Sequence, residues 1–146
     1  MRRRTGRNAG KGSAGKPRAR VAKAQELFQR GMLDDAAKEL ERSLSVNKDD
    51  REALDLLSQV ETERENLLEA VKALTRVKQI DPSDISVFFR LADLYRRMND
   101  LDNAASLLKA VEDAEGENPR VWEGLRDLHL LRKEMVPAYA MHKKIM

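Results

Sequence analysis

Four alanines share one register along this chain. Ala36, Ala70, Ala104 and Ala138 recur at a constant 34-residue spacing. A sequence that repeats at this period is constrained to fold as a series of similar units, each of which buries its apolar side chains against its neighbours. A larger side chain at such a position would push two crossing helices beyond their usual separation of about 8 to 10 Å. The period is typical of a helical hairpin repeated along the chain.

Three further columns of equivalent positions are apolar in at least three units of four. They lie three residues before, four residues after and seven residues after the alanines. Their members are Leu33, Leu67, Leu101 and Met135; Leu40, Leu74, Leu108 and His142; and Ser43, Val77, Val111 and Ile145. Apolar residues at spacings of three and four form a stripe on one face of a helix. In each unit, one break in this apolar pattern divides the unit into two helices. These breaks fall near Gly31, Asn66, Asn99 and Glu134.

The opening helix of each hairpin carries two more apolar columns. Their members are Leu54, Phe88 and Trp122 in one column and Leu57, Leu91 and Leu125 in the other. In the first unit Arg20 and Lys23 occupy these columns, so the agreement fails mainly in that helix.

The predicted boundaries of the helices carry their own signals. Asp81-Pro82-Ser83-Asp84 and Asn118-Pro119 each place a capping side chain or a proline at a helix start. Gly116 suits the end of the preceding helix. Pro137 is expected near the beginning of the final helix, where its missing amide hydrogen does little harm.

The third unit resembles the tetratricopeptide repeat signature. That signature is an aromatic residue, then Leu with a small residue, Tyr, Ala, a large apolar residue and Pro. The matching residues are Phe88, Leu91, Ala92, Tyr95, Ala104 and Leu108. Gly116 replaces the last Pro. The second unit matches through Leu54, Leu57, Ser58, Ala70, Leu74 and Pro82. It has Glu61 where Tyr is expected. The fourth unit opens with Trp122 and Leu125 and then departs from the signature at Arg126, His129 and His142.

The resemblance implies an all-α fold, a right-handed α-solenoid of antiparallel helical hairpins. Its predicted domain covers residues 20–146, with units at about 17–50, 51–84, 85–118 and 119–146. A solenoid of this kind has a concave inner face, which suits a protein-interaction scaffold or adaptor that binds a partner segment. The resemblance further implies that the first helix of each hairpin lines the groove. The predicted groove residues are Gln25, Phe28, Asp55, Gln59, Thr62, Phe89, Arg90, Asp93, Arg96, Arg97, Glu123, Asp127 and Leu130.

Phe89 is the strongest candidate among the predicted groove residues. It follows Phe88, which the register assigns to the core, so it points about 100° away on the helix as an exposed aromatic anchor. Arg96 and Arg97 could pair with an acidic partner segment. Relatives of this family that bind the acidic tails of heat-shock chaperones use Lys, Asn and Arg at inner positions, and that set is absent here. Three carboxylates would repel a carboxylate terminus and favour a mixed or basic ligand. They belong to Asp55, Asp93 and Asp127.

Residues 1–19 form a basic tail rich in Gly and Arg. Residues 1–23 hold nine Lys or Arg and no acid, so 19 of the 28 basic residues remain against 25 acidic ones, a net charge of −6 for the rest. With almost no large apolar side chain, the tail is expected to be disordered. Its charges suggest an alternative role as a nucleic-acid- or ribosome-associated adaptor with non-specific contacts. The candidate contacts are Arg2, Arg3, Arg4, Arg7, Lys11 and Lys16. A solubilising or targeting arm is the other reading of the tail.

No catalytic, cofactor-binding or metal-binding constellation emerges from the sequence, and the chain is expected not to be an enzyme. Gly10 to Pro17 approximates a phosphate-binding loop, but Pro17 stands where Ser or Thr must be. His129 and His142 are well separated along the chain, without nearby Cys, and are expected to be structural. The chain has no Cys and no apolar run long enough to span a bilayer, which favours a cytoplasmic location.

The C-terminal end leaves apolar side chains available to form an open edge. They are Tyr139, Met141, Ile145 and Met146. Three explanations stay open: this edge joins two copies as a homodimer, a partner covers it, or the chain is a piece of a longer array.

Overall fold

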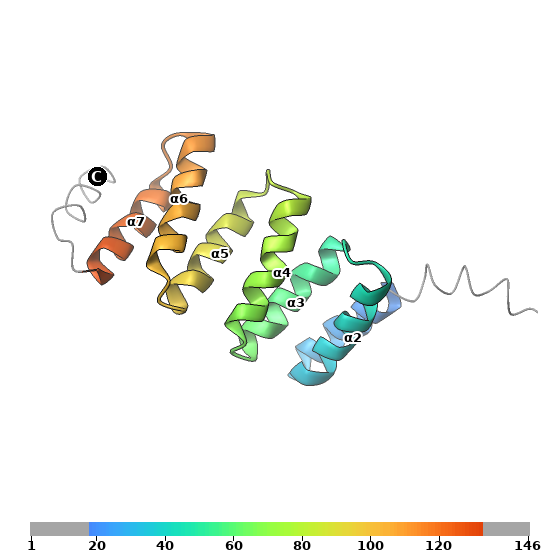
Figure 1. Cartoon of the computed structure of the whole chain (residues 1–146). Coiled ribbons are helices and arrows are strands. Elements are labelled where there is room, and N and C mark those ends of the chain that lie inside the picture. The colour runs from blue at the N-terminus through green and yellow to red at the C-terminus, as the bar shows by residue number, and fades with distance from the viewer. Residues whose placement is uncertain (1–17, 133–146) are drawn as a thin grey trace, which may run out of the picture. The chain divides into compact units, whose positions relative to one another are not determined.

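The computed structural model of the chain describes residues 18–132 (Figure 1). Within this range every regular element is an α-helix, and no strand occurs. This confirms the predicted all-α fold. By its internal contacts the chain divides into two compact units, Met1–Ile80 and Asp81–Met146, here called unit 1 and unit 2. The division falls in the connection between the second and third predicted hairpins.

Unit 1 holds four helices within the described range. The first covers residues 18–29 and is followed by α2 (Leu33–Val46), α3 (Arg51–Glu63) and α4 (Leu67–Ile80). Helix α3 packs against both α2 and α4. The first helix contributes Val21 and Ala24 to a core cluster with Ala36, Leu40 and Val60. Small residues therefore allow this helix to pack although Arg20 and Lys23 stand in its apolar columns.

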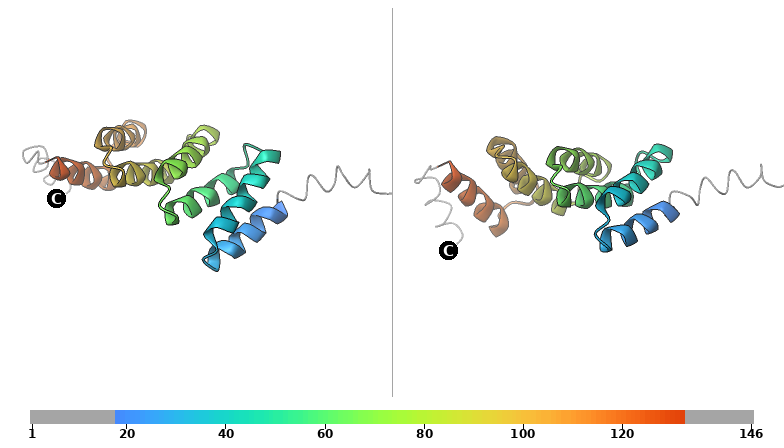
Figure 2. Two further views of the ribbon diagram at one scale, coloured as in Figure 1. Left: turned by 60° about the horizontal axis from the view of Figure 1, so that its bottom comes forward. Right: turned by 90° about the horizontal axis from the view of Figure 1, so that it is seen from below.

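Unit 2 holds three described helices, α5 (Ile85–Arg97), α6 (Leu101–Glu115) and α7 (Pro119–Leu131). Helix α6 packs against both α5 and α7, and Figure 2 shows it on one side of the layer that those two helices form. Gly124 makes the contact between α6 and α7 close, because a β-carbon there would lie 2.7 Å from Leu108 Cδ1. The family signature places its small residue two positions later, at Arg126.

The 34-residue register predicted from the alanines is confirmed in the boundaries of the helices. Helices α2, α4 and α6 begin at Leu33, Leu67 and Leu101, and α3, α5 and α7 begin at Arg51, Ile85 and Pro119. Each member of the second set starts after a capping side chain. The caps are Asp50 on Ala53 N, Asp84 on Ser86 N and Asn118 on Arg120 N, at 3.2, 3.1 and 2.9 Å. As predicted, Asp84 and Asn118 cap their helices, Pro119 opens α7, and Gly116 ends α6.

The turn inside each described hairpin follows the same register. Gly31, Glu65 and Asn99 have positive φ angles of 78°, 65° and 63°. In each turn, the next residue donates its backbone N–H to the carbonyl oxygen five residues earlier. The acceptors are Leu27, Glu61 and Tyr95. This pattern is the Schellman motif that ends a helix through a left-handed residue. The break expected near Asn66 therefore centres on Glu65.

The alanine column and the columns four and seven residues after it are buried, whereas the column three residues before it, at Leu33, Leu67 and Leu101, is half-buried. Ala36, Ala70 and Ala104 are at most 1% exposed, and the leucines four residues later are also buried. The aromatic column differs in the third unit, where Phe88 is only half-buried and Val87 before it is 1% exposed. Lys23 is exposed. Leu91, the other predicted column member of α5, is 1% exposed, so the departure from the predicted columns of this helix is at Phe88.

Several predictions fall outside residues 18–132. They include Ala138, Glu134, Pro137 and His142, the C-terminal edge, the phosphate-loop-like segment and all six candidate nucleic-acid contacts. Arg18 and Ala19, assigned to the tail, are helical. No described helix has both the length and the apolar character to cross a membrane.

Candidate interaction surfaces

The first helices of unit 1 carry the predicted groove residues on one stripe each. Gln25 and Phe28 lie on the helix of residues 18–29, and Asp55, Gln59 and Thr62 lie on α3 at spacings of four and three. The two glutamines are exposed, and the other three side chains are half-buried. We call these five residues the first-helix face of unit 1. Thr62 Oγ1 donates to Ser58 O at 2.6 Å, so its hydroxyl is directed back to its own helix.

The first-helix face of unit 2 is formed by α5 and α7. Its members are Phe89, Arg90, Asp93, Arg96 and Arg97 on α5 and Arg120, Glu123, Asp127 and Leu130 on α7. The structure brings the two helices together at Phe89, where Arg120 Cζ lies 3.9 Å from the ring centroid. Phe89 is half-buried and one face of its ring is covered, so it is not the fully exposed anchor that the sequence suggested.

The remaining charges on this face are partly paired within their own helices. Arg96 forms an ion pair with Asp93 one turn away. Arg126 Nε lies 3.5 Å from the Asp127 carboxylate. Arg97 and Asp127 are exposed, whereas Arg90 is half-buried. Pairs of exposed charges contribute little to folding, so these side chains remain adaptable at a surface.

Helices α3 and α5 occupy equivalent places in their hairpins but differ in charge. Helix α3 carries one arginine and four carboxylates, whereas α5 carries three arginines and one carboxylate. The formal balance is therefore −3 for α3 and +2 for α5. Even without the buried Glu61, which is paired with Arg64, α3 stays net negative and α5 net positive, so the two helices favour partner groups of opposite sign.

A buried carboxylate replaces the signature tyrosine in the second hairpin. Glu61 is 5% exposed and accepts from Arg64 Nη1 at 2.6 Å and from Asn66 Nδ2 at 3.1 Å. Arg64 Nε also lies 3.1 Å from the Asp34 carboxylate of α2. The side-chain hydrogen bond to Glu61 raises the pKa of the Arg64 guanidinium above its ordinary value. The network joins the ends of two hairpins inside unit 1.

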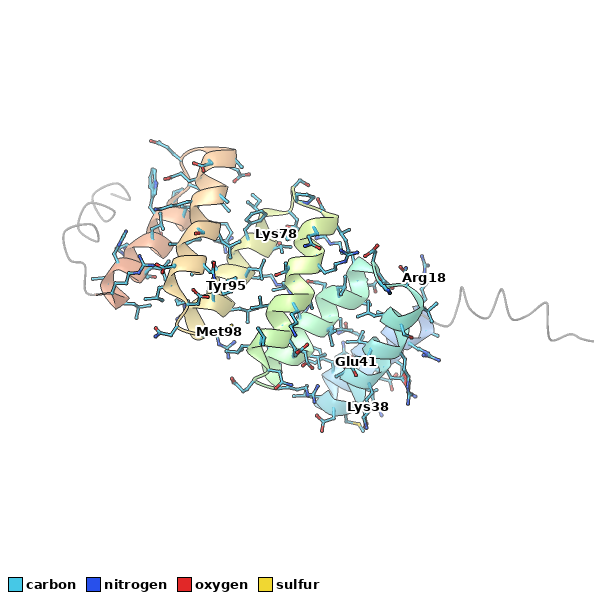
Figure 3. All side chains as sticks on the ribbon, in the orientation of Figure 1. Arg18, Lys38, Glu41, Lys78, Tyr95 and Met98 are labelled. Atoms are coloured by element: carbon cyan, nitrogen blue, oxygen red, sulfur yellow. The ribbon has the colours of Figure 1, made fainter. Side chains whose placement is uncertain are left out.

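A shallow depression lies beside this network. It has a volume of about 750 Å³ and is lined by the turn at Gly31, the start of α2, Lys38, Arg64 and Asn66. Figure 3 shows Lys38 and Glu41 projecting from α2. The lining carries as many carboxylates as cationic groups, and its Asp34 and Arg64 are already paired. Open and electrically balanced, the depression lacks the enclosed apolar lining of a small-molecule site.

The described residues hold no cluster of three or more His, Cys, Asp or Glu side chains that could bind a metal ion. His129 is half-buried on α7. Trp122, in the signature aromatic column, is buried and donates from Nε1 to Glu112 Oε2 at 2.9 Å.

Sequence reasoning missed Arg120, the residue that covers Phe89. The two residues lie on different helices, so no helical spacing relates them. The repeat period gives no signal either, because the register equivalent of Phe89 in α7 is Glu123 and not Arg120.

Two models described as "Tetratricopeptide repeat" match residues 21–85 and 62–130. Peroxisome biogenesis protein 5 of Arabidopsis thaliana is 31% identical over 87 residues, which is 60% of this chain. The match covers only 12% of that relative's length.

Solved structures agree on the fold. A crystal structure of MamA superimposes with a TM-score of 0.78 at 15% identity, over 95% of this chain and 81% of that one. A tetratricopeptide repeat protein from Parabacteroides merdae gives 0.77 at 13% identity, over 88% and 50%. These likenesses show the fold alone. The two matching models, in agreement with the register and the turns, show that the chain belongs to the tetratricopeptide repeat family, a class of protein-interaction modules.

Proposed function

We propose that the chain is a scaffold or adaptor that binds a segment of a partner protein along its first-helix faces. In the family's solenoids the first helices line the concave groove. The observation that carries the proposal is the Phe89–Arg120 pair, in which an aromatic ring and a guanidinium from two first helices lie together outside the packing columns. Aromatic and arginine side chains dominate the binding energy of protein interfaces.

The first-helix face of unit 1 supports the same role with different chemistry. Gln25 and Gln59 offer amide donors and acceptors, and α3 adds the carboxylate of Asp55. None of the five residues of this face belongs to the fully buried core. By itself, this face would therefore favour polar or basic groups of a partner.

The test is a comparison of first-helix and second-helix variants of the full chain. A partner is isolated by affinity purification with nuclease present, and its binding is then measured by calorimetry. Phe89→Ala is expected to weaken binding by at least about 1 kcal/mol, because it removes the ring and the platform under Arg120. The control is Val46→Ala, which truncates an exposed apolar side chain on the second helix α2. Equal affinity for Phe89→Ala and the unmodified chain would remove Phe89 from the site.

The basic tail supports a second proposal, a nucleic-acid- or ribosome-associated adaptor. Residues 1–23 concentrate nine Lys or Arg without a carboxylate, which is the composition that neutralises phosphates by counterion release. Binding to an RNA oligonucleotide should then fall steeply with salt and on deletion of residues 1–19. Affinity that is indifferent to salt, or unchanged by the deletion, would exclude this role.

A further inference from the structure

Arg120 is held by an aromatic ring and lacks a carboxylate partner within residues 18–132. It lies in the first turn of α7, where its guanidinium Cζ is 3.9 Å from the centroid of Phe89 on α5. Glu123 lies one turn further along α7, within reach of an intrahelical ion pair, yet the described part of α7 shows no such pair. The Arg120 side chain therefore packs on the ring instead of pairing within its own helix.

Stacking leaves the hydrogen-bonding edge of a guanidinium available. The five N–H donors of arginine lie in the plane of the group, so a ring against its face does not consume them. The ring also restricts the guanidinium to one orientation, which lowers the entropic cost of forming a bidentate pair with a carboxylate. Phe89 thus acts as a positioning residue for Arg120.

The charged side chains of α5 around the Phe89–Arg120 pair favour a negatively charged ligand. Helix α5 carries Arg90, Arg96 and Arg97 against a single carboxylate, and that carboxylate is paired with Arg96. The carboxylates of α7, at Glu123 and Asp127, lie after Arg120 along that helix. An acidic segment would therefore be attracted along α5, whereas α7 beyond Arg120, where Arg126 pairs with Asp127 and Glu123 adds a negative charge, offers no such attraction.

We infer that unit 2 binds an acidic peptide segment of a partner protein along α5, with one carboxylate of the segment held by Arg120 on its Phe89 platform. This inference rests on the proposed scaffold function and assigns the chemistry of the ligand at one face. It departs from the mixed or basic ligand expected from the sequence, because Asp93 is paired with Arg96 and α5 carries an excess of arginine.

The experiment is a selection from a random peptide library displayed on phage, with the full chain as bait. Enriched peptides are expected to carry several Asp or Glu residues. For a synthetic enriched peptide, Arg120→Ala should lower the affinity about tenfold, the effect of losing one charge-assisted pair. Arg120→Lys should rescue only part of that loss, because lysine keeps the charge but cannot form the planar bidentate contact. Phe89→Leu should weaken binding less than Arg120→Ala does.

Lys109→Ala is the matched control, because it removes one exposed cation from the second helix α6 of the same unit. Enrichment of basic or neutral peptides, or an equal loss with the control and with Arg120→Ala, would overturn the inference and leave the scaffold function standing. No enrichment at all would count against both. Binding of a single-stranded oligonucleotide that requires Arg120, without enrichment of acidic peptides, would overturn the inference in favour of a nucleic-acid ligand.

Discussion

The left-handed residues inside the hairpins show how one backbone geometry is met by three different side chains. Gly31 adopts positive φ without strain, and asparagine at position 99 tolerates it. Glu65 has no such tolerance, yet it adopts a φ of 65° because the helices on both sides hold the turn in place. The second hairpin therefore carries backbone strain that the other two described turns avoid.

Exchanging glycine and alanine at two of these turns measures that strain. Glycine rather than alanine should favour folding by about 1 kcal/mol at both position 65 and position 31, because a β-carbon opposes the left-handed conformation. The comparison is Glu65→Gly against Glu65→Ala, which cancels the loss of the glutamate side chain, and Gly31→Ala against the unmodified chain. At Gly31 a β-carbon would meet nothing within 4 Å, so the effect there is one of backbone alone. Urea denaturation gives the free energies of unfolding, and equal stability of Glu65→Gly and Glu65→Ala would contradict the account.

At the scale of the helix, the first helices α3, α5 and α7 are short and each is capped, and α5 in particular has a low intrinsic helix propensity. Helix α5 contains Val87, Phe88 and Phe89, which are poor helix formers, and it is 13 residues long. Isolated helices of this length are marginal in water. Each of these helices begins at an acceptor side chain in the same register position. Capping and burial together hold helices that would not form alone.

Removing the cap of α7 should therefore destabilise unit 2 and disturb the arginine that follows it. Asn118→Ala is expected to cost about 1 kcal/mol, because the amide N–H of Arg120 loses its acceptor at the helix start. Glu117→Ala, one residue earlier and exposed, serves as the control and should change stability little. Thermal unfolding followed by circular dichroism distinguishes them. Equal unfolding temperatures for the two variants would show that the cap does not stabilise α7.

At the scale of the whole molecule, the repeat divides into two compact units although its register is continuous. The division falls in the connection between α4 and α5, at Ile80 and Asp81. Repeat proteins are stabilised mainly by contacts between neighbouring elements, so local damage need not spread through the chain. The two helices of opposite charge, α3 and α5, lie on different units.

Equivalent leucines test whether the two units respond separately. Leu40 in α2 and Leu108 in α6 occupy the same column, and both are buried. Truncating either to alanine should cost about 2 to 4 kcal/mol locally, through lost burial and a cavity. Native-state hydrogen exchange should show that Leu40→Ala lowers protection mainly within residues 18–80 and Leu108→Ala mainly within 81–132. A uniform loss across both ranges would show a single cooperative unit.

By itself the sequence determined the all-α fold, the 34-residue hairpin period, the buried alanine column and the capped helix starts within the described residues. These features depend on contacts between residues a few positions apart or on a pattern repeated in each hairpin, so a linear pattern records them. Only the tertiary structure decided that Phe89 is covered by Arg120, that Glu61 is a buried and paired carboxylate, and that Glu65 bears the left-handed turn. Each of these depends on how neighbouring helices orient a particular side chain or turn in space, which no spacing along the chain specifies.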